Sequence, residues 1–137
     1  MSKYFEPKDD EWYVGCYFYL LDINGIVKFG ITANWEKREI AYKKEVGNVP
    51  FTIIKKEFYD KRWKAELMEQ IVKWRLRPWC VDGRHEWINA PIQIVINCYL
   101  DTRDMIIPEI SKYSYIHKTG NDRWGYYKQI CDMIFKE

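Results

Sequence analysis

The feature that most constrains the fold is a strand–turn–strand pattern near the start of the chain, "WYVGCYFYLLDINGIVKFGIT". Residues 12–21 and 26–31 are rich in aromatic and β-branched side chains, as strands are. The Asn24–Gly25 pair between them favours a tight hairpin turn, because both residues tolerate positive φ. Pairing across this turn places Tyr19 opposite Gly30. The pattern therefore predicts an antiparallel hairpin.

The two faces of the predicted hairpin differ in chemistry. One face is fully apolar and is expected to face the core: Phe18, Leu20, Phe29 and Ile31. The other is mixed: Tyr17, Tyr19, Leu21, Lys28, Gly30 and Thr32. A glycine within a strand often marks a place where another group approaches the backbone closely. The mixed face therefore predicts a polar cleft above Gly30. The alternative is a second small core of tyrosines with the Lys28 stem passing over it.

The rest of the chain indicates several helices and one further strand. Asn34 is a suitable N-cap, and proline disfavours helical geometry in the residue before it, so Pro78 ends a helix. The segment "IQIVINCYL" (92–100) fits a buried helix or a strand, and the helix is preferred. We expect helices after Asn34, from Asp60 to Pro78, over 92–100 and from Asp122, a strand over 51–59, and a loop over 80–87.

Composition narrows the class of protein. The chain has 137 residues, which fits a single domain over 1–137. Its net charge of +2 neither requires nor excludes a nucleic-acid partner. No apolar stretch approaches the ~20 residues of a membrane span, and the N-terminus lacks the apolar core of a signal peptide, so a cytoplasmic protein without a membrane partner is expected.

The cysteines do not indicate a disulfide framework. Four cysteines are scattered without a CxxC pair, so reduced thiols are expected. A zinc site built from Cys80 and His85 with Cys98 or His117 lacks paired ligand spacing and is disfavoured.

The predicted hairpin carries "GCY" at 15–17 in its first strand and "KFG" at 28–30 in its second. These two motifs resemble the first and second motifs of the GIY-YIG nuclease superfamily, with Lys28 where a tyrosine is usual. Arg38 stands where family members carry an arginine on the next helix. The helix "AELMEQIVKW" (65–74) resembles the one that carries the family's metal-binding glutamate. "GRHEW" (83–87) is similar to a "GxxEWF" ending in a phage- and fungus-associated branch.

The resemblance implies a fold and an activity. The fold would be α+β, with a small three-stranded antiparallel sheet flanked by helices over about 13–90 and a helical C-terminal extension over 91–137. The activity would be metal-dependent hydrolysis of DNA phosphodiester bonds by an endonuclease encoded by a phage or mobile element and acting in the host cytoplasm. Cutting both strands would need a homodimer or two binding events.

The resemblance also implies roles for individual residues. Tyr17 would act as base or water-orienting group, and Lys28 would supply a cation that favours the phenolate. Arg38 suits bidentate contact with a phosphate, and Tyr42 lies one turn later on the same face. Glu69 would bind Mg²⁺ or Mn²⁺. The substrate would also contact Tyr19, Gly30 and Thr32.

Glu66 and Glu69 could each bind the metal, and their positions on the helix distinguish them. Glu69 lies at the edge of an apolar stripe, whereas Glu66 neighbours Arg62, Gln70 and Lys73 on what is expected to be a solvated face. We therefore expect Glu69 to be the ligand; a boundary carboxylate paired with a basic side chain is its structural alternative. Glu86 is a further candidate acid. Asn89 and Asn97 are candidates for an asparagine found late in several family members.

Two other functions stay open at this stage. A non-catalytic member of the same fold would use the cleft to bind nucleic acid, a nucleotide or a host protein. An inhibitor of a host defence protein would carry the cleft without cutting. Lys28, in place of a tyrosine, and the modest net charge are compatible with either.

Overall fold

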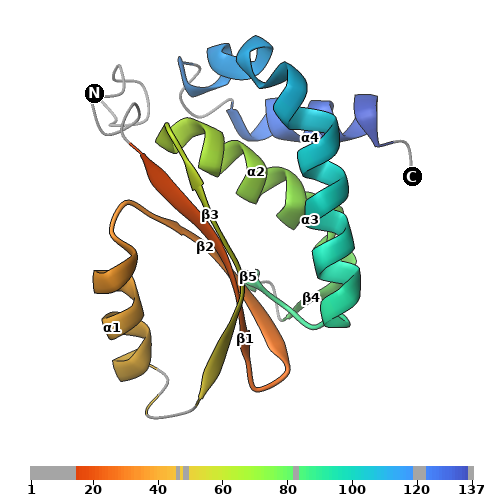
Figure 1. Ribbon diagram of the computed structural model, residues 1–137. Helices are drawn as coiled ribbons and strands as arrows, with labels where there is room; N and C mark the ends of the chain where they lie inside the picture. Colours follow the sequence, from red (N-terminus) through yellow and green to blue (C-terminus); the bar gives the residue numbers. More distant parts are fainter. Residues whose placement is uncertain (1–14, 46, 48–49, 82–83, 119–122, 136–137) are drawn as a thin grey trace, which may run out of the picture.

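The computed structural model places one antiparallel sheet between a single helix on one face and a group of helices on the other (Figure 1). It describes residues 15–45, 47, 50–81, 84–118 and 123–135. The strands are β1 (Cys16–Ile23), β2 (Ile26–Thr32), β3 (Phe51–Tyr59), β4 (Cys80–Val81) and β5 (Arg84–Ile88). The helices are α1 (Trp35–Glu45), α2 (Arg62–Arg75), α3 (Ile92–Ile106) and α4 (Arg123–Ile134), with the 3₁₀ helices η2 (Arg77–Trp79) and η3 (Ile107–Lys118). The α+β class is confirmed.

The hairpin of β1 and β2 forms in the expected register. Tyr19 pairs with Gly30, and Leu21 pairs with Lys28. Asn24 and Gly25 make the turn with φ values of 54° and 88°, which is why this dipeptide suits the position. The Asp22 carboxylate accepts a 2.9 Å hydrogen bond from the Gly25 amide and holds the turn closed.

The sheet has five strands in the described part of the chain, in the order β3-β1-β2-β5-β4, so the expectation of three strands is wrong. The segment 80–87, expected to be a loop, supplies β4 and β5. β5 pairs with β2 at Val27 and Lys28 and leaves the stretch of β2 from Phe29 to Thr32 without a neighbouring strand on that side among the described residues. We call this stretch the open edge of the sheet.

Each face of the hairpin packs into its own core. Phe18, Leu20 and Phe29 belong to the main core under α2, α3 and α4. Tyr19 and Leu21, on the other face, pack with Trp35 and Tyr42 of α1 in a smaller core; the full set of its buried residues is Tyr19, Leu21, Ile23, Trp35 and Tyr42. The second small core, which is the alternative to a polar cleft on this face, therefore exists, and Tyr19 is part of it.

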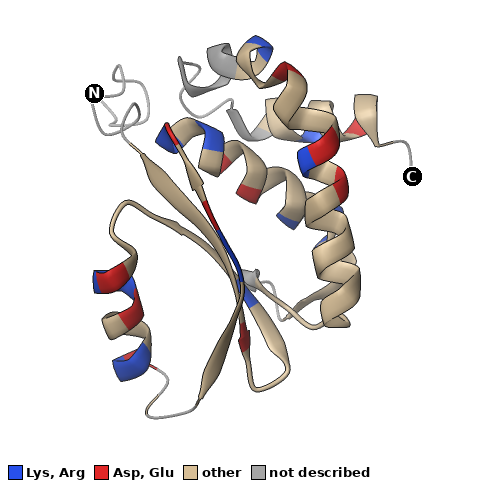
Figure 2. Cartoon of the chain, in the orientation of Figure 1, with Lys and Arg blue, Asp and Glu red and all other residues tan. Residues whose placement is uncertain are grey.

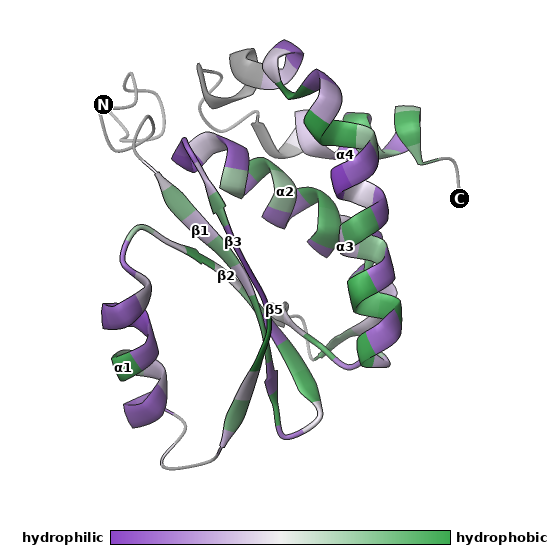
Figure 3. Ribbon diagram, viewed as in Figure 1, coloured by the Kyte–Doolittle hydropathy of each residue, from purple (hydrophilic) through white to green (hydrophobic). Residues whose placement is uncertain are grey.

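Most of the exposed side chains of helix α1 are charged, with Ile40 as an exposed apolar one. Acidic and basic residues follow one another along it (Figure 2), and it is the most hydrophilic of the helices in Figure 3. Only Trp35 and Tyr42 are buried in it. Asn34 caps its start as expected, because the Asn34 side-chain oxygen accepts a 3.0 Å hydrogen bond from the Lys37 amide. None of the helices in the described part of the chain is long and apolar enough to cross a membrane.

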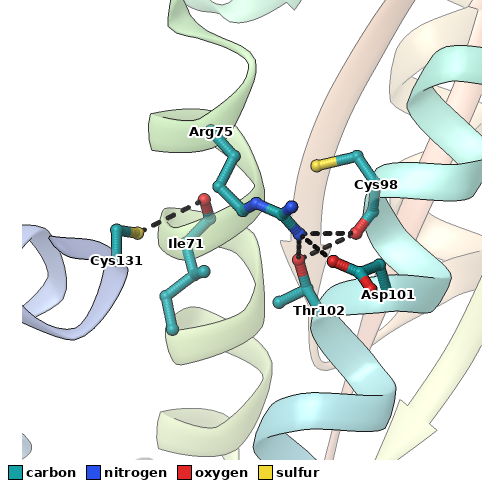
Figure 4. A network of polar contacts seen from close by, with 6 residues as sticks. All are labelled: Ile71, Arg75, Cys98, Asp101, Thr102 and Cys131. Carbon is teal, nitrogen blue, oxygen red and sulfur yellow. Dashed lines mark hydrogen bonds and ion pairs between the residues drawn. The ribbon is translucent and has the colours of Figure 1, made fainter. Parts of the chain in front are cut away.

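The C-terminal extension is joined to α2 by a partly buried polar network (Figure 4). The Arg75 guanidinium donates hydrogen bonds of 2.9 Å to the Thr102 hydroxyl and 3.4 Å to the Cys98 carbonyl, and lies 3.0 Å from the Asp101 carboxylate. It also stacks 3.8 Å from the Phe135 ring centroid. The helices α3 and α4 are confirmed, and this network fixes their place on α2.

Replacing Arg75 with alanine should destabilise the fold. We expect the free energy of unfolding to fall by about 2 kcal/mol, because the change removes hydrogen bonds made by a charged group and leaves the Thr102 hydroxyl with one partner fewer. Urea unfolding measures the loss. As a control, Asp101→Ala should cost less than about 1 kcal/mol, since the Asp101 side chain is 56% exposed. Equal losses in the two variants would show that the ion pair, and not the hydrogen bonds, joins the helices.

Candidate active site

A polar cavity of about 410 Å³ lies at the open edge of the sheet. It is bounded by the hairpin, by α1 on one face of the sheet and by α2 on the other. The hairpin contributes Tyr19, Lys28, Phe29, Gly30 and Ile31, α1 contributes Arg38, Tyr42 and Glu45, and α2 contributes Arg62, Glu66 and Glu69. The edge is open here because β5 stops pairing with β2 at Lys28. Side chains from both faces of the sheet can therefore meet in one cleft.

The hairpin side of the cleft is organised around two hydrogen-bonded tyrosines. The hydroxyls of Tyr19 and Tyr42 lie 2.7 Å apart and are buried. Burial, followed by the hydrogen bond with Tyr42, raises the pKa of Tyr19 above its ordinary value. Tyr19 is therefore a neutral phenol at neutral pH, able to donate and accept hydrogen bonds.

Gly30 makes room for Tyr19. A Cβ at position 30 would overlap the ring and the hydroxyl of Tyr19, its cross-strand partner. The sequence pattern predicted a close approach at Gly30, and the approaching group is this protein side chain. Any larger residue at position 30 would displace the tyrosine from the cleft.

Two cations flank Tyr42. The Lys28 ammonium lies 5.7 Å from the centroid of the Tyr42 ring and 5.2 Å from that of Trp87, and the lysine is only 6% exposed. The guanidinium of Arg38, an exposed residue of α1, lies 5.8 Å from the same Tyr42 ring. Attraction of a cation to a ring face holds each group within reach of the cleft. The hairpin side is thus suited to an anionic ligand.

The α2 side of the cleft carries two buried carboxylates. Glu69 is 6% exposed; its Oε1 accepts a 2.9 Å hydrogen bond from the Gln70 amide and lies 3.9 Å from the Lys73 ammonium. Glu66 is 8% exposed, and its Oε2 accepts a 2.7 Å hydrogen bond from the Tyr127 hydroxyl. The expectation that Glu66 lies on a solvated face is wrong, because α4 packs over that part of α2. Burial therefore does not separate the two glutamates.

The cleft gathers most, but not all, of the residues that the sequence indicated. Lys28, Arg38, Tyr42 and Glu69 line it, as do Tyr19 and Gly30. Tyr17 does not: its ring contacts Phe58 at 5.2 Å between centroids and lies 5.6 Å from the Lys56 ammonium, toward β3. Thr32 is also outside the lining, where its hydroxyl donates to the Asn34 carbonyl at 3.1 Å.

Other candidate residues lie away from the cleft or outside the described side chains. Asn89 is exposed, and Asn97 is bonded to Gln93 on α3. The side chains of His85, Glu86 and His117 are outside the described part of the structure. No three His, Cys, Asp or Glu side chains gather as a metal cluster among the described residues.

Arg62 and Glu66 are cleft residues that sequence reasoning did not select. Both lie on α2, and both occupied positions that helical periodicity assigned to a solvated face. The sequence signal for burial of this face of α2 lies in α4, because its buried residues Tyr127 and Ile130 must pack against another helix. That signal is weak in the sequence, because it does not say which face of which helix is covered.

The donor set on α2 suits a hard divalent cation. Mg²⁺ and Mn²⁺ prefer carboxylate oxygens and water, and Mg²⁺ is often bound by one or two carboxylates with the remaining positions filled by water and substrate phosphate. Glu66 and Glu69 supply two carboxylates one turn apart, in a cleft whose opposite wall can hold a phosphate. The residues present therefore fit such an ion.

Comparison of the chain with protein-family models, with curated proteins and with solved structures finds no match.

Two buried tyrosines should make the fold sensitive to alkaline pH. Burial raises the pKa of both Tyr19 and Tyr59 above the ordinary value of 10.0. Because the folded state holds these protons more tightly, this contribution is complete below pH 10 and is lost as the pH rises toward the folded-state pKa values. We expect the free energy of unfolding to fall by up to about 1.4 kcal/mol per pH unit for each tyrosine.

The Tyr59→Phe variant tests this pH dependence. Tyr59 lies outside the cleft and bonds the Tyr99 hydroxyl at 2.8 Å, so its replacement leaves the cleft unchanged. Urea unfolding on both sides of pH 10 should give a shallower decline for Tyr59→Phe than for the wild type. The same decline in both proteins would mean that Tyr59 has no raised pKa in the folded state.

Proposed function

We propose that the protein is a metal-dependent DNA endonuclease with a GIY-YIG-type catalytic domain, and that the cleft at the open edge is its active site. The observation that supports this best is the pairing of chemistries in one cavity. Arg38, Lys28 and two tyrosines stand on one wall, and two buried carboxylates stand on the other. Phosphodiester hydrolysis needs both a phosphate-binding wall and a cation-binding wall.

Each wall has a distinct task in this proposal. Glu69 holds Mg²⁺ or Mn²⁺, and the bound ion supplies Lewis-acid stabilisation of charge on the phosphate and the leaving oxygen. Arg38 binds the phosphate through its planar fork of donors. Lys28, held over the Tyr42 and Trp87 rings, adds positive charge that draws the DNA backbone into the cleft.

The water-orienting role belongs to Tyr19 rather than to Tyr17, because Tyr19 lines the cleft. Its raised pKa keeps the hydroxyl protonated, so it acts by hydrogen bonding and not as a phenolate base. The Tyr42 hydroxyl, 2.7 Å away, fixes its direction. Tyr42 also lies beside Arg38, whose guanidinium is 5.8 Å from the centroid of the Tyr42 ring.

The substrate and the biological source are inferred from the resemblance to the GIY-YIG nuclease superfamily. The substrate would be DNA, and the source a phage or mobile element whose protein acts in the cytoplasm of the host. One cleft cuts one strand, so cleavage of both strands would take a homodimer or two binding events.

Cleavage of supercoiled plasmid DNA tests the proposed function. Purified wild-type protein should nick the plasmid with Mg²⁺ or Mn²⁺, and EDTA should abolish the nicking. Activity that persists in EDTA would contradict a metal-dependent mechanism. Absence of cleavage on plasmid, phage and modified DNA with either ion would leave a binding function as the better account of the cleft.

The non-catalytic alternative rests on Lys28. A buried lysine in place of the usual tyrosine gives the cleft one more cation and one hydroxyl fewer, which favours anion binding. In that case the protein would bind DNA or a nucleotide, or would inhibit a host defence protein. DNA binding that weakens as salt rises, does not require divalent cations and leaves the DNA uncut would support this alternative.

A further inference from the structure

Tyr127 connects the C-terminal extension directly to the cleft. It lies on α4, is 4% exposed, and donates a 2.7 Å hydrogen bond to Oε2 of Glu66 on α2. Hydroxyl-to-carboxylate bonds of this length are short and charge-assisted. The two residues are separated by 61 positions in the chain, so the bond exists only because α4 docks on α2.

The docking of α4 is secured one turn after this bond. Ile130 and Cys131 are buried against the main core, and the Cys131 thiol lies 3.9 Å from the Ile71 carbonyl (Figure 4). Because α4 is held at these points, the Tyr127 hydroxyl has a fixed position relative to α2.

A tyrosine is a suitable partner for a carboxylate that must keep its charge. A buried carboxylate needs hydrogen bonds. The Tyr127 hydroxyl supplies one to Oε2 of Glu66 without itself adding a positive charge. Glu66 lines the cleft while it makes this bond.

We propose that Tyr127 is a positioning residue that holds Glu66 as the second carboxylate of the cation site beside Glu69, so that the C-terminal extension completes the active site. This proposal rests on the proposed nuclease function. Side chains three positions apart on a helix are neighbours, which brings the two carboxylates to one part of the cleft. Partners that orient metal-binding groups are commonly needed for full metal affinity.

Mn²⁺ binding to the protein without DNA tests the proposal, with free Mn²⁺ followed by electron paramagnetic resonance. Tyr127→Phe keeps the ring and removes the hydroxyl, and we expect it to weaken Mn²⁺ binding about tenfold. Tyr59→Phe, which also removes a buried tyrosine hydroxyl bond but far from the cleft, should bind Mn²⁺ like the wild type. Glu66→Gln should weaken binding at least as much as Tyr127→Phe.

The double variant Tyr127→Phe/Glu66→Gln shows whether the two residues act together. If Tyr127 works through Glu66, the double variant should bind Mn²⁺ no more weakly than Glu66→Gln alone. Multiplying effects would overturn the proposal, as would wild-type binding by Tyr127→Phe or by Glu66→Gln. Thermal unfolding of each variant confirms that it is folded at the temperature of the measurement.

Glu69→Gln separates failure of this inference from failure of the proposed function. If Glu69→Gln loses Mn²⁺ binding while Tyr127→Phe keeps it, the cation site stands and only the role of Tyr127 is wrong. If Glu69→Gln binds Mn²⁺ like the wild type, the proposed cation site itself is wrong.

Discussion

Glu69→Gln should lose at least about 10³-fold of the Mg²⁺-dependent cleavage rate of the wild type. Stabilisation of the phosphate by a bound metal ion is worth several kcal/mol, and each 1.36 kcal/mol changes a rate tenfold. The amide of glutamine is nearly isosteric with the carboxylate but is a poor ligand for a hard cation. A single-turnover nicking assay on plasmid DNA measures the loss.

A DNA-binding measurement shows whether Glu69→Gln cleaves slowly because the catalytic step is impaired or because the protein no longer binds DNA. Removing a negative charge from the cleft should leave DNA affinity unchanged or slightly higher. Glu57→Gln is the matched control, since Glu57 is a partly buried carboxylate on β3 that pairs with Arg103 at 3.0 Å, outside the cleft. Glu57→Gln should cut at the wild-type rate. A Glu69→Gln protein that cuts as fast as the wild type would refute the metal assignment.

Arg38→Lys should lower the cleavage rate by about 10²-fold although it keeps the positive charge. A guanidinium binds two phosphate oxygens through a rigid planar fork, and an ammonium cannot reproduce that geometry. The expected fall in rate is similar to that caused by removing one hydrogen-bond donor from an oxyanion hole, because Arg38→Lys would remove one donor to the charge that develops on the phosphate. Single-turnover rates with saturating DNA report it.

Stability should not change in Arg38→Lys, because Arg38 is an exposed residue of α1. The neighbouring Lys37, also exposed, provides the control: Lys37→Ala should cut normally. Arg38→Ala should be at least as slow as Arg38→Lys. If lysine at position 38 restored full activity, the role of Arg38 would be general electrostatic attraction of DNA rather than phosphate positioning.

The parts of the fold that the sequence predicts well are those determined by local chemistry. The Asn24–Gly25 turn requires positive φ at both residues, and this two-residue turn is consistent with the observed register of β1 against β2. Asn34 ends up as the cap of α1 for an equally local reason. The alternation of apolar residues on the hairpin assigns Phe18 and Phe29 to the core.

The parts that the sequence does not predict depend on contacts between distant segments. β4 has two residues, too few to show any periodicity, and β5 forms by pairing with β2 about 60 positions earlier. Burial of Glu66 depends on α4, which comes 61 positions later in the contact with Tyr127. Neither effect leaves a pattern in the residues concerned.

Which of Tyr17 and Tyr19 lines the cleft also depends on contacts between distant segments. Both lie on the same face of β1, so the hairpin register cannot separate them. The position of α1 does, because Tyr42 of that helix meets the Tyr19 hydroxyl, whereas Tyr17 lies against Phe58 of β3. Lys28, Arg38 and Glu69, which the resemblance indicated, all line the cleft.

The central claim, that one cleft holds both a divalent cation and a phosphate, is tested most directly by a crystal soaked in Mn²⁺ and a short DNA oligonucleotide. Anomalous scattering locates Mn²⁺ without ambiguity. We expect an anomalous peak at the carboxylate of Glu69 and a DNA phosphate within hydrogen-bonding distance of Arg38. A Mn²⁺ ion bound away from Glu69, or DNA bound on another surface with the cleft empty, would contradict this account.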